Sequence, residues 1–181
     1  RHHLGRGQGD DAWTADNLYA QAIRVRRDFI RVDADEVTYS LHVILRFELE
    51  RALIAGELSV ADIPDAWNDG MTRYLGLSTD GNFKDGCMQD VHWFSGLFGY
   101  FPTYTLGALM AAQWFAAATK CIPDIETRIR TGDFAPVVSW LRREIHWRGQ
   151  LKTARELLTE ITGEPLNIRY FKDHLERRYL G

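Results

Sequence analysis

The chain has 181 residues, of which 45% are hydrophobic and 26% are charged, a composition typical of a globular protein rather than a disordered one. Its formal net charge of −3 argues against a nucleic-acid binder with a basic surface. No apolar run approaches about 18 residues and no signal-peptide core is present, so neither a membrane span nor secretion is predicted. Cys87 and Cys121 lack a CxxC spacing, which favours reduced cysteines in a cytoplasmic protein.

The first residues are polar and Gly-rich and carry no periodicity, so residues 1–13 are predicted to be a flexible lead-in or a cloning remnant. Residues 14–181 are predicted to form one helical region. Thr14 is suited to cap a first helix, because apolar side chains recur at helical spacing directly after it. Residues 27–35 break this pattern and are predicted to be an irregular connector.

A second helix is predicted over residues 36–55, ending at Gly56. Asp33 followed three positions later by Glu36 resembles a capping box that would start it. One face of this helix is apolar along its whole length, formed by Val37, Leu41, Ile44, Leu45, Leu49 and Leu53. We therefore expect the helix to bury this face in a core.

The rest of the chain also has helical periodicity, separated by a loop over residues 77–86. The run over residues 91–120 is expected to be bent or interrupted near residues 99–102, because Pro102 lacks the amide hydrogen that a helix needs. The remaining helices are predicted at residues 59–76, 133–150, 153–162 and 169–179. No series of strands and no fixed repeat occurs, so the chain is predicted to be all-α with seven to nine helices.

Polar and aromatic residues gather in the segment 86–107. Asp90 is suited either to cap a helix that starts near residue 91 or to act in catalysis. His92 is suited to be a hydrogen-bonded core residue or a site residue. Tyr100 and Tyr104 are four positions apart and would share a helix face, to which His92 could also point. Donors that converge in this way are suited to stabilise an oxyanion.

Arg31 lies between two apolar residues in the connector. An arginine can grip a carboxylate with two parallel hydrogen bonds, so Arg31 is a candidate for binding an acidic ligand. The alternative is a salt bridge to Asp33, Asp35 or another acidic residue. Asp35 is expected to cap a helix.

Metal-binding patterns are missing from the sequence. It holds no HExxH, no HxH and no Cys–His cluster, which are the local spacings typical of zinc sites. It also lacks a Gly-rich phosphate loop and a GxSxG elbow. The residues alone therefore predict a helical region with one polar and aromatic site and no metal ligands.

Two strings carry a more specific signal, namely IRVDAD at residues 30–35 and GCMQDVHW at residues 86–93. They match the patterns [IV]RxxAD and GxxQDxHW, and with several other strings in the right order they resemble the C-terminal portion of the Taq-type thermostable carboxypeptidases. The resemblance covers residues 14–181. The family's HExxH helix and its HES(Q), HPF and DxRxT motifs do not occur in the chain.

The resemblance implies the C-terminal part of a larger, mostly helical, groove-containing metallopeptidase. Such an enzyme uses zinc to release single amino acids from peptide C-termini, and it is expected to be a cytoplasmic homodimer. His92, with Tyr100 or Tyr104, would supply donors to the transition state. Arg31 would hold the substrate carboxylate, and Gln89 and Asp90 would orient the groove.

The same resemblance implies that the chain by itself binds no zinc and is inactive, since the zinc ligands would lie in an N-terminal part with which it associates. Its substrates would be peptides. The alternative is a non-catalytic helical module that binds a peptide or protein through the Trp- and Tyr-rich residues.

Overall fold

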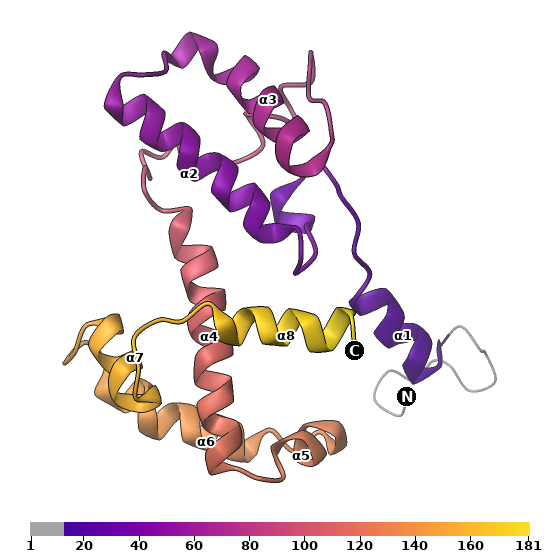
Figure 1. Ribbon diagram of the computed structural model, residues 1–181, viewed down its shortest axis with the longest axis vertical. Coiled ribbons are helices and arrows are strands. Elements are labelled where there is room, and N and C mark those ends of the chain that lie inside the picture. Colours follow the sequence, from indigo (N-terminus) through magenta and orange to yellow (C-terminus); the bar gives the residue numbers. More distant parts are fainter. Residues whose placement is uncertain (1–12) are drawn as a thin grey trace. The chain divides into compact units, whose positions relative to one another are not determined.

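The computed structural model describes residues 13–181, which form eight α-helices and short 3-10 helices with no strand among them (Figure 1). The all-α prediction is therefore confirmed. Except for Trp13, the predicted lead-in lies outside the described residues. The chain divides into two compact units, the first ending at Thr105 and the second running from Leu106 to Gly181.

The first unit is built around two long helices, α2 and α3. Its elements in chain order are α1 (Ala15–Ala22), η2 (Arg31–Asp33), α2 (Tyr39–Ala55), η3 (Val60–Asp62) and α3 (Ile63–Leu75). Thr14 caps α1 by accepting a hydrogen bond from the Asn17 amide at 3.2 Å. Gly56 and Gly76 end α2 and α3 with left-handed φ angles of 73° and 67°, which glycine adopts without steric cost.

Helix α2 starts three residues later than predicted, because Asp35 rather than the Asp33–Glu36 pair organises its entry. The Asp35 carboxylate accepts hydrogen bonds from the amides of Val37 and Thr38 at 2.9 and 3.0 Å. Its other oxygen accepts one from the Arg26 amide at 2.8 Å. Asp35 thus joins the connector to the turn that precedes α2. It does not cap the helix as expected, since the N-cap position is occupied by Thr38 and carries no side-chain capping hydrogen bond.

Helices α2 and α3 lie side by side (Figure 1). Their shared core contains Leu45, Leu49, Trp67, Met71 and Leu75. The helices approach closely at Gly70, where an added Cβ would lie 2.1 Å from Leu45 Cδ1. The predicted apolar face of α2 is therefore buried only in part, since Leu45 and Leu49 lie in this core whereas Ile44 is 38% exposed.

The helix predicted over residues 91–101 is not formed, and a series of turns connects residue 90 to α4 (Pro102–Cys121). Gly96 and Gly99 have φ angles of 71° and 77°, which interrupt a right-handed helix. Pro102 then opens α4 at a position that needs no amide donor. His92 and Tyr100 consequently do not share a helix face, and Asp90 caps no helix.

Most of α4 belongs to the second unit, with α5 (Ile125–Thr131), α6 (Ala135–Glu144), η4 (His146–Arg148), α7 (Ala154–Thr162) and α8 (Arg169–Tyr179). The core of this unit contains Ala118, Ile125 and Trp140. Thr153 and Glu156 form a capping box at the start of α7. None of the described helices is both long and apolar enough to cross a membrane.

Candidate active site

Asp90 is the centre of the polar cluster in the first unit. Arg31 donates to Asp90 Oδ1 from Nε and Nη2 at 3.1 and 2.7 Å. A second arginine, Arg46 of α2, donates to Asp90 Oδ2 from Nε at 2.6 Å. The carboxylate is thus shared by two guanidinium groups, one on each oxygen.

This cluster is almost closed to solvent. The side chains of Arg31, Arg46 and Asp90 are 6%, 0% and 12% exposed. Burial alone would raise the pKa of Asp90, but the hydrogen bonds and charges of Arg31 and Arg46 outweigh it and the pKa is lowered. Burial alone would also lower the pKa of Arg31, but its bonds and attraction to Asp90 raise it. All three groups are charged at neutral pH.

Gln89 fixes the backbone on either side of Arg31. Its Oε1 accepts a hydrogen bond from the Arg31 amide at 2.8 Å. Its Nε2 donates to the carbonyl oxygens of Phe29 and Asp85 at 2.9 and 2.7 Å. The connector and the segment before His92 are therefore tied together, which explains why the two sequence motifs lie in one site.

His92 lies beside this cluster, with its Nδ1 3.8 Å from Asp90 Oδ1. Its Nε2 is hydrogen bonded to the Tyr104 hydroxyl at 2.9 Å. The Tyr100 ring centroid is 5.8 Å from the imidazole and 5.5 Å from the ring of Tyr104. The Phe101 ring packs against the imidazole, with 4.4 Å between the ring centroids and an angle of 37° between the ring planes. One imidazole and two phenols thus converge, as predicted, although the backbone that brings them together is not a helix.

These residues differ in how much of each is exposed to solvent. His92 is 9% exposed and Phe101 is 1% exposed, whereas Tyr100 is 45% exposed. All six predicted site residues belong to one connected network that runs from Gln89 through Arg31, Asp90 and His92 to the two tyrosines. Arg31 forms an ion pair with Asp90, which is the alternative that the sequence left open, so a contact with substrate stays a prediction.

A second, polar face of α2 was not predicted from the sequence. Tyr39, His42, Arg46 and Glu50 follow each other at helical spacing, and the last three are buried. Tyr39 accepts a hydrogen bond from Arg31 Nη1 at 2.8 Å. Glu50 accepts bonds from Trp93 Nε1 and the Gly99 amide at 2.9 and 3.1 Å. This polar face is the surface on which the segment around His92 is fixed.

His42 is fully buried in this face. Burial, followed by the charges of Arg46 and Arg31, lowers its pKa to about 4. The imidazole is therefore neutral at physiological pH. The spacing of residues 39, 42, 46 and 50 is visible in the sequence, but only the partners on the segment 89–104 distinguish it from a solvated face.

The described residues do not fit a metal centre. No group of three or more His, Cys, Asp or Glu side chains among them is placed to hold a metal ion. In the polar cluster, Asp90 is already paired with two arginines and His42 lies close to both of their charges. A cation would be repelled there.

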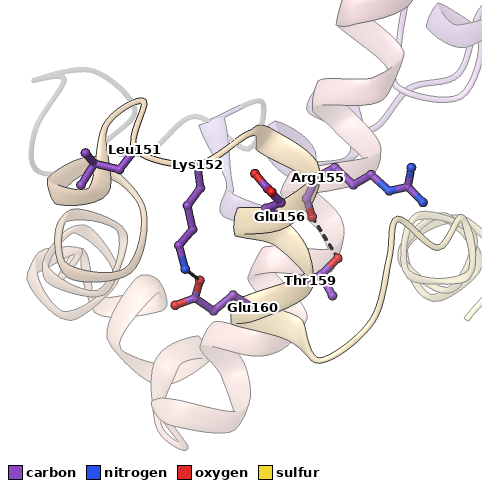
Figure 2. A pocket seen from close by; sticks show the side chains of 6 residues that line it. All are labelled: Leu151, Lys152, Arg155, Glu156, Thr159 and Glu160. Atoms are coloured by element: carbon purple, nitrogen blue, oxygen red, sulfur yellow. Dashed lines mark hydrogen bonds and ion pairs between the residues drawn. The ribbon is translucent and has the colours of Figure 1, made fainter.

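An open depression of about 640 Å³ lies in the second unit, beside α7. Figure 2 shows the side chains that line it, which are Leu151, Lys152, Arg155, Glu156, Thr159 and Glu160. Lys152 forms an ion pair with Glu160, and Thr159 donates to the Arg155 carbonyl oxygen at 2.9 Å. It contains none of the predicted site residues, and we assign it no role.

The fold and the motifs that form this cluster define a class of helical metallopeptidases. The profile of the carboxypeptidase Taq (M32) metallopeptidase family matches residues 3–179. The chain therefore belongs to this family. The match begins within the segment that was predicted to be a lead-in.

Curated relatives agree with this assignment. The chain is 41% identical over 168 residues to thermostable carboxypeptidase 1 of Pyrococcus furiosus, covering 93% of this chain and 34% of that protein. It is 48% identical over 155 residues to thermostable carboxypeptidase 1 of Thermus thermophilus, covering 86% and 30% respectively. The chain thus spans about a third of the length of these relatives.

Solved structures show the same fold. The chain matches the metallocarboxypeptidase 1 of Trypanosoma cruzi with a TM-score of 0.91 and 44% identity, over 95% of this chain and 36% of that one. It matches the M32 carboxypeptidase of Deinococcus radiodurans R1 with a TM-score of 0.85 and 39% identity, over 93% and 35%.

Proposed function

We propose that the chain supplies transition-state and substrate-binding residues to a zinc carboxypeptidase that releases single amino acids from peptide C-termini. The observation that carries the proposal is the hydrogen bond between His92 and Tyr104, beside Tyr100, in a chain of a carboxypeptidase family. Attack of water on a peptide carbonyl places negative charge on its oxygen. N–H and O–H groups held ready for that charge lower the barrier, because they need no reorganisation.

His92 and Tyr104 are suited to this role because of their different surroundings. If His92 carries its proton on Nε2, it donates to the Tyr104 oxygen, and the phenol proton is directed away toward a ligand. Tyr100, which is half exposed, offers a second hydroxyl. Phe101 and the buried cluster keep water from one side of the imidazole, which strengthens its hydrogen bonds.

Arg31, Gln89 and Asp90 are proposed to form the substrate-binding part. A guanidinium has five N–H donors, and Asp90 and Tyr39 engage three of those of Arg31. The remaining N–H groups on Nη1 and Nη2 are our candidates for the terminal carboxylate of a peptide. Gln89 and Asp90 would hold the guanidinium in place for this contact.

The zinc ion is proposed to be bound by residues outside the described part of this chain. They would belong to a longer enzyme, in the part that matches the other two thirds of the relatives. The exposed apolar side chains around the site support such an association. Val91, Phe94 and Phe98, all within six positions of His92 in the sequence, are 71%, 69% and 49% exposed, and a partner surface would cover such apolar groups. A homodimer and a cytoplasmic location stay predictions.

A hybrid enzyme tests the proposal, made by replacing the matching third of the Thermus thermophilus relative with this chain. We expect it to release C-terminal amino acids from peptides. In the hybrid, His92→Ala is expected to lower kcat about 100- to 1,000-fold, the typical effect of losing one oxyanion donor, because the Tyr104 hydroxyl loses the group that directs its proton toward the substrate. A folded, zinc-loaded hybrid without activity, or with normal turnover after His92→Ala, would contradict the proposal.

A further inference from the structure

Arg46 is fully buried at the centre of the polar cluster, on the opposite side of Asp90 from Arg31. We propose that Arg46 is a positioning residue, which orients the imidazole of His92 toward Tyr104 without touching substrate. The inference deepens the proposed function, since it rests on the role proposed there for His92.

The first connection from Arg46 to His92 runs through Asp90. Arg46 Nε and Nη2 lie 2.6 and 2.5 Å from Asp90 Oδ2. Its Nη1 donates to the carbonyl oxygen of His42, one turn earlier on α2, at 2.7 Å. The guanidinium is therefore fixed to the helix at one end and to Asp90 at the other, two positions before His92.

The second connection runs through Phe101. The Arg46 guanidinium carbon lies 5.3 Å from the centroid of the Phe101 ring and 4.5 Å from that of Trp67. Phe101 in turn packs against the His92 ring. A cation held near an aromatic ring is attracted to its π-electrons, so Arg46 helps to fix the ring on which the imidazole rests.

Stability alone does not account for Arg46. Burial lowers its pKa to about 10 in spite of Asp90, which shows that the charge is held in an unfavourable place. Removing the sole partner of a buried charge is strongly destabilising because the charge is left uncompensated, but Arg31 also forms an ion pair with Asp90 and would keep that carboxylate paired without Arg46. The planar guanidinium of Arg46 bridges Asp90 Oδ2 and the His42 carbonyl oxygen at fixed angles. Neither an apolar residue nor a lysine can form this bridge.

The test uses the 181-residue chain labelled with nitrogen-15, because imidazole nitrogen signals report hydrogen bonding of His92 directly. Tyr104→Phe removes the phenol and defines the signals of His92 without its partner. Arg46→Met is expected to move the Nε2 signal at least halfway toward that reference while the helical circular dichroism is unchanged. Arg51→Met, on the exposed side of the same helix, is the matched control and is expected to change nothing.

Arg46→Lys tests the proposal if Arg46→Met does not fold, because lysine keeps the positive charge but lacks the planar guanidinium. It is expected to shift the His92 signal in the same direction. Wild-type His92 signals in a folded Arg46→Met or Arg46→Lys chain would overturn the proposal. In the hybrid enzyme, Arg46→Lys is expected to lower kcat about 10- to 100-fold, by analogy with the groups that orient metal-binding side chains, with KM within about twofold of the wild type.

The two readouts separate the failure of this inference from that of the proposed function. The spectra need no activity, so unchanged His92 signals overturn the role of Arg46 and leave the proposed function standing. If Arg46→Lys shifts the His92 nitrogen signal but leaves kcat of the hybrid unchanged, the proposed catalytic role of His92 would instead be contradicted.

Discussion

The Tyr104 hydroxyl lies 2.9 Å from His92 Nε2, although twelve positions separate the two residues. Tyr104 stands in the first turn of α4 and His92 in the turns before it. Pro102 begins the helix between them. The pair therefore depends on where α4 starts, and it is connected through Asp90 to two buried arginines.

Tyr104→Phe is the most conservative test of this pair, because it removes one hydroxyl and keeps the ring. In the hybrid enzyme we expect kcat to fall about 100-fold or more, the typical result of losing one oxyanion donor. The midpoint of thermal unfolding should change little. Both are measured by steady-state kinetics and circular dichroism.

Tyr170→Phe is the control for that substitution. Tyr170 also donates a hydrogen bond from its hydroxyl, to Glu164 at 2.5 Å, but it lies in α8 of the second unit. It is expected to leave kcat unchanged. If both variants retained wild-type turnover, Tyr104 would not be a donor to the transition state.

Much of the fold could be predicted from local patterns. The start of α1, the end of α3 and both ends of α8 follow from Thr14, Gly76 and helical periodicity, since capping and spacing act over a few residues. The segment 91–101 could not be predicted in this way. Its aromatic residues have helical spacing, but left-handed glycines at 96 and 99 and hydrogen bonds to Glu50 on another helix determine its course.

The sequence predicted which residues belong to the site better than it predicted how they are arranged. Conspicuous residue types identified His92, Tyr104 and Arg31. Arg46 was missed because an arginine on an amphipathic helix is usually exposed, and its burial depends on Asp90, which is 44 positions away. Ion pairs across such distances leave no local pattern in the sequence.

Arg31→Ala tests the proposed contact with the substrate carboxylate. If Arg31 binds that group, the variant should cleave free-acid peptides less efficiently and lose part of its preference for them over C-terminally amidated peptides. A charge-assisted pair is lost only with the acid substrate. The ratio of kcat/KM for the two substrates in the hybrid enzyme is the measurement.

Arg31→Lys is the matched variant, because it keeps the charge near Asp90. It is expected to retain more of the preference than Arg31→Ala. If the ratio of kcat/KM for acid and amide substrates is unchanged in a folded Arg31→Ala enzyme, another residue binds the substrate carboxylate. Arg31 would then only form the ion pair with Asp90.

Acid should destabilise the first unit in two steps. The pKa of His42 is about 4 in the folded chain, below its ordinary value of 6.5, so the unfolded chain takes up a proton first. The free energy of unfolding should therefore fall between about pH 6.5 and pH 4, by at most about 3 kcal/mol. Asp90 has a lowered pKa, so its contribution is present above the ordinary pKa of aspartate and is lost as the pH falls further.

Urea unfolding at a series of pH values measures this dependence. His42→Gln should flatten the curve between pH 6.5 and pH 4, whereas His146→Gln, at an exposed position, should leave it as it is. A curve with the same slope in the wild type and in His42→Gln would show that His42 is not the group responsible.

The exposed apolar residues predict that the chain alone self-associates or binds hydrophobic dyes. Val91→Ser with Phe94→Ser should reduce both effects, because these side chains are 71% and 69% exposed. Phe134→Ser, at a residue 55% exposed in the second unit, is the control and is expected to change self-association and dye binding less. Sedimentation and dye fluorescence that show a monomeric, dye-silent wild type would count against this prediction.

Metal content and peptidase activity of the 181-residue chain, measured on one dialysed sample, test the account most directly. A catalytic zinc site normally uses three protein ligands and keeps one position for water. The described residues offer no such group, so we predict no stoichiometric zinc and no release of C-terminal amino acids, with both restored in the hybrid enzyme. One tightly bound zinc ion per chain together with measurable release of amino acids would contradict the account.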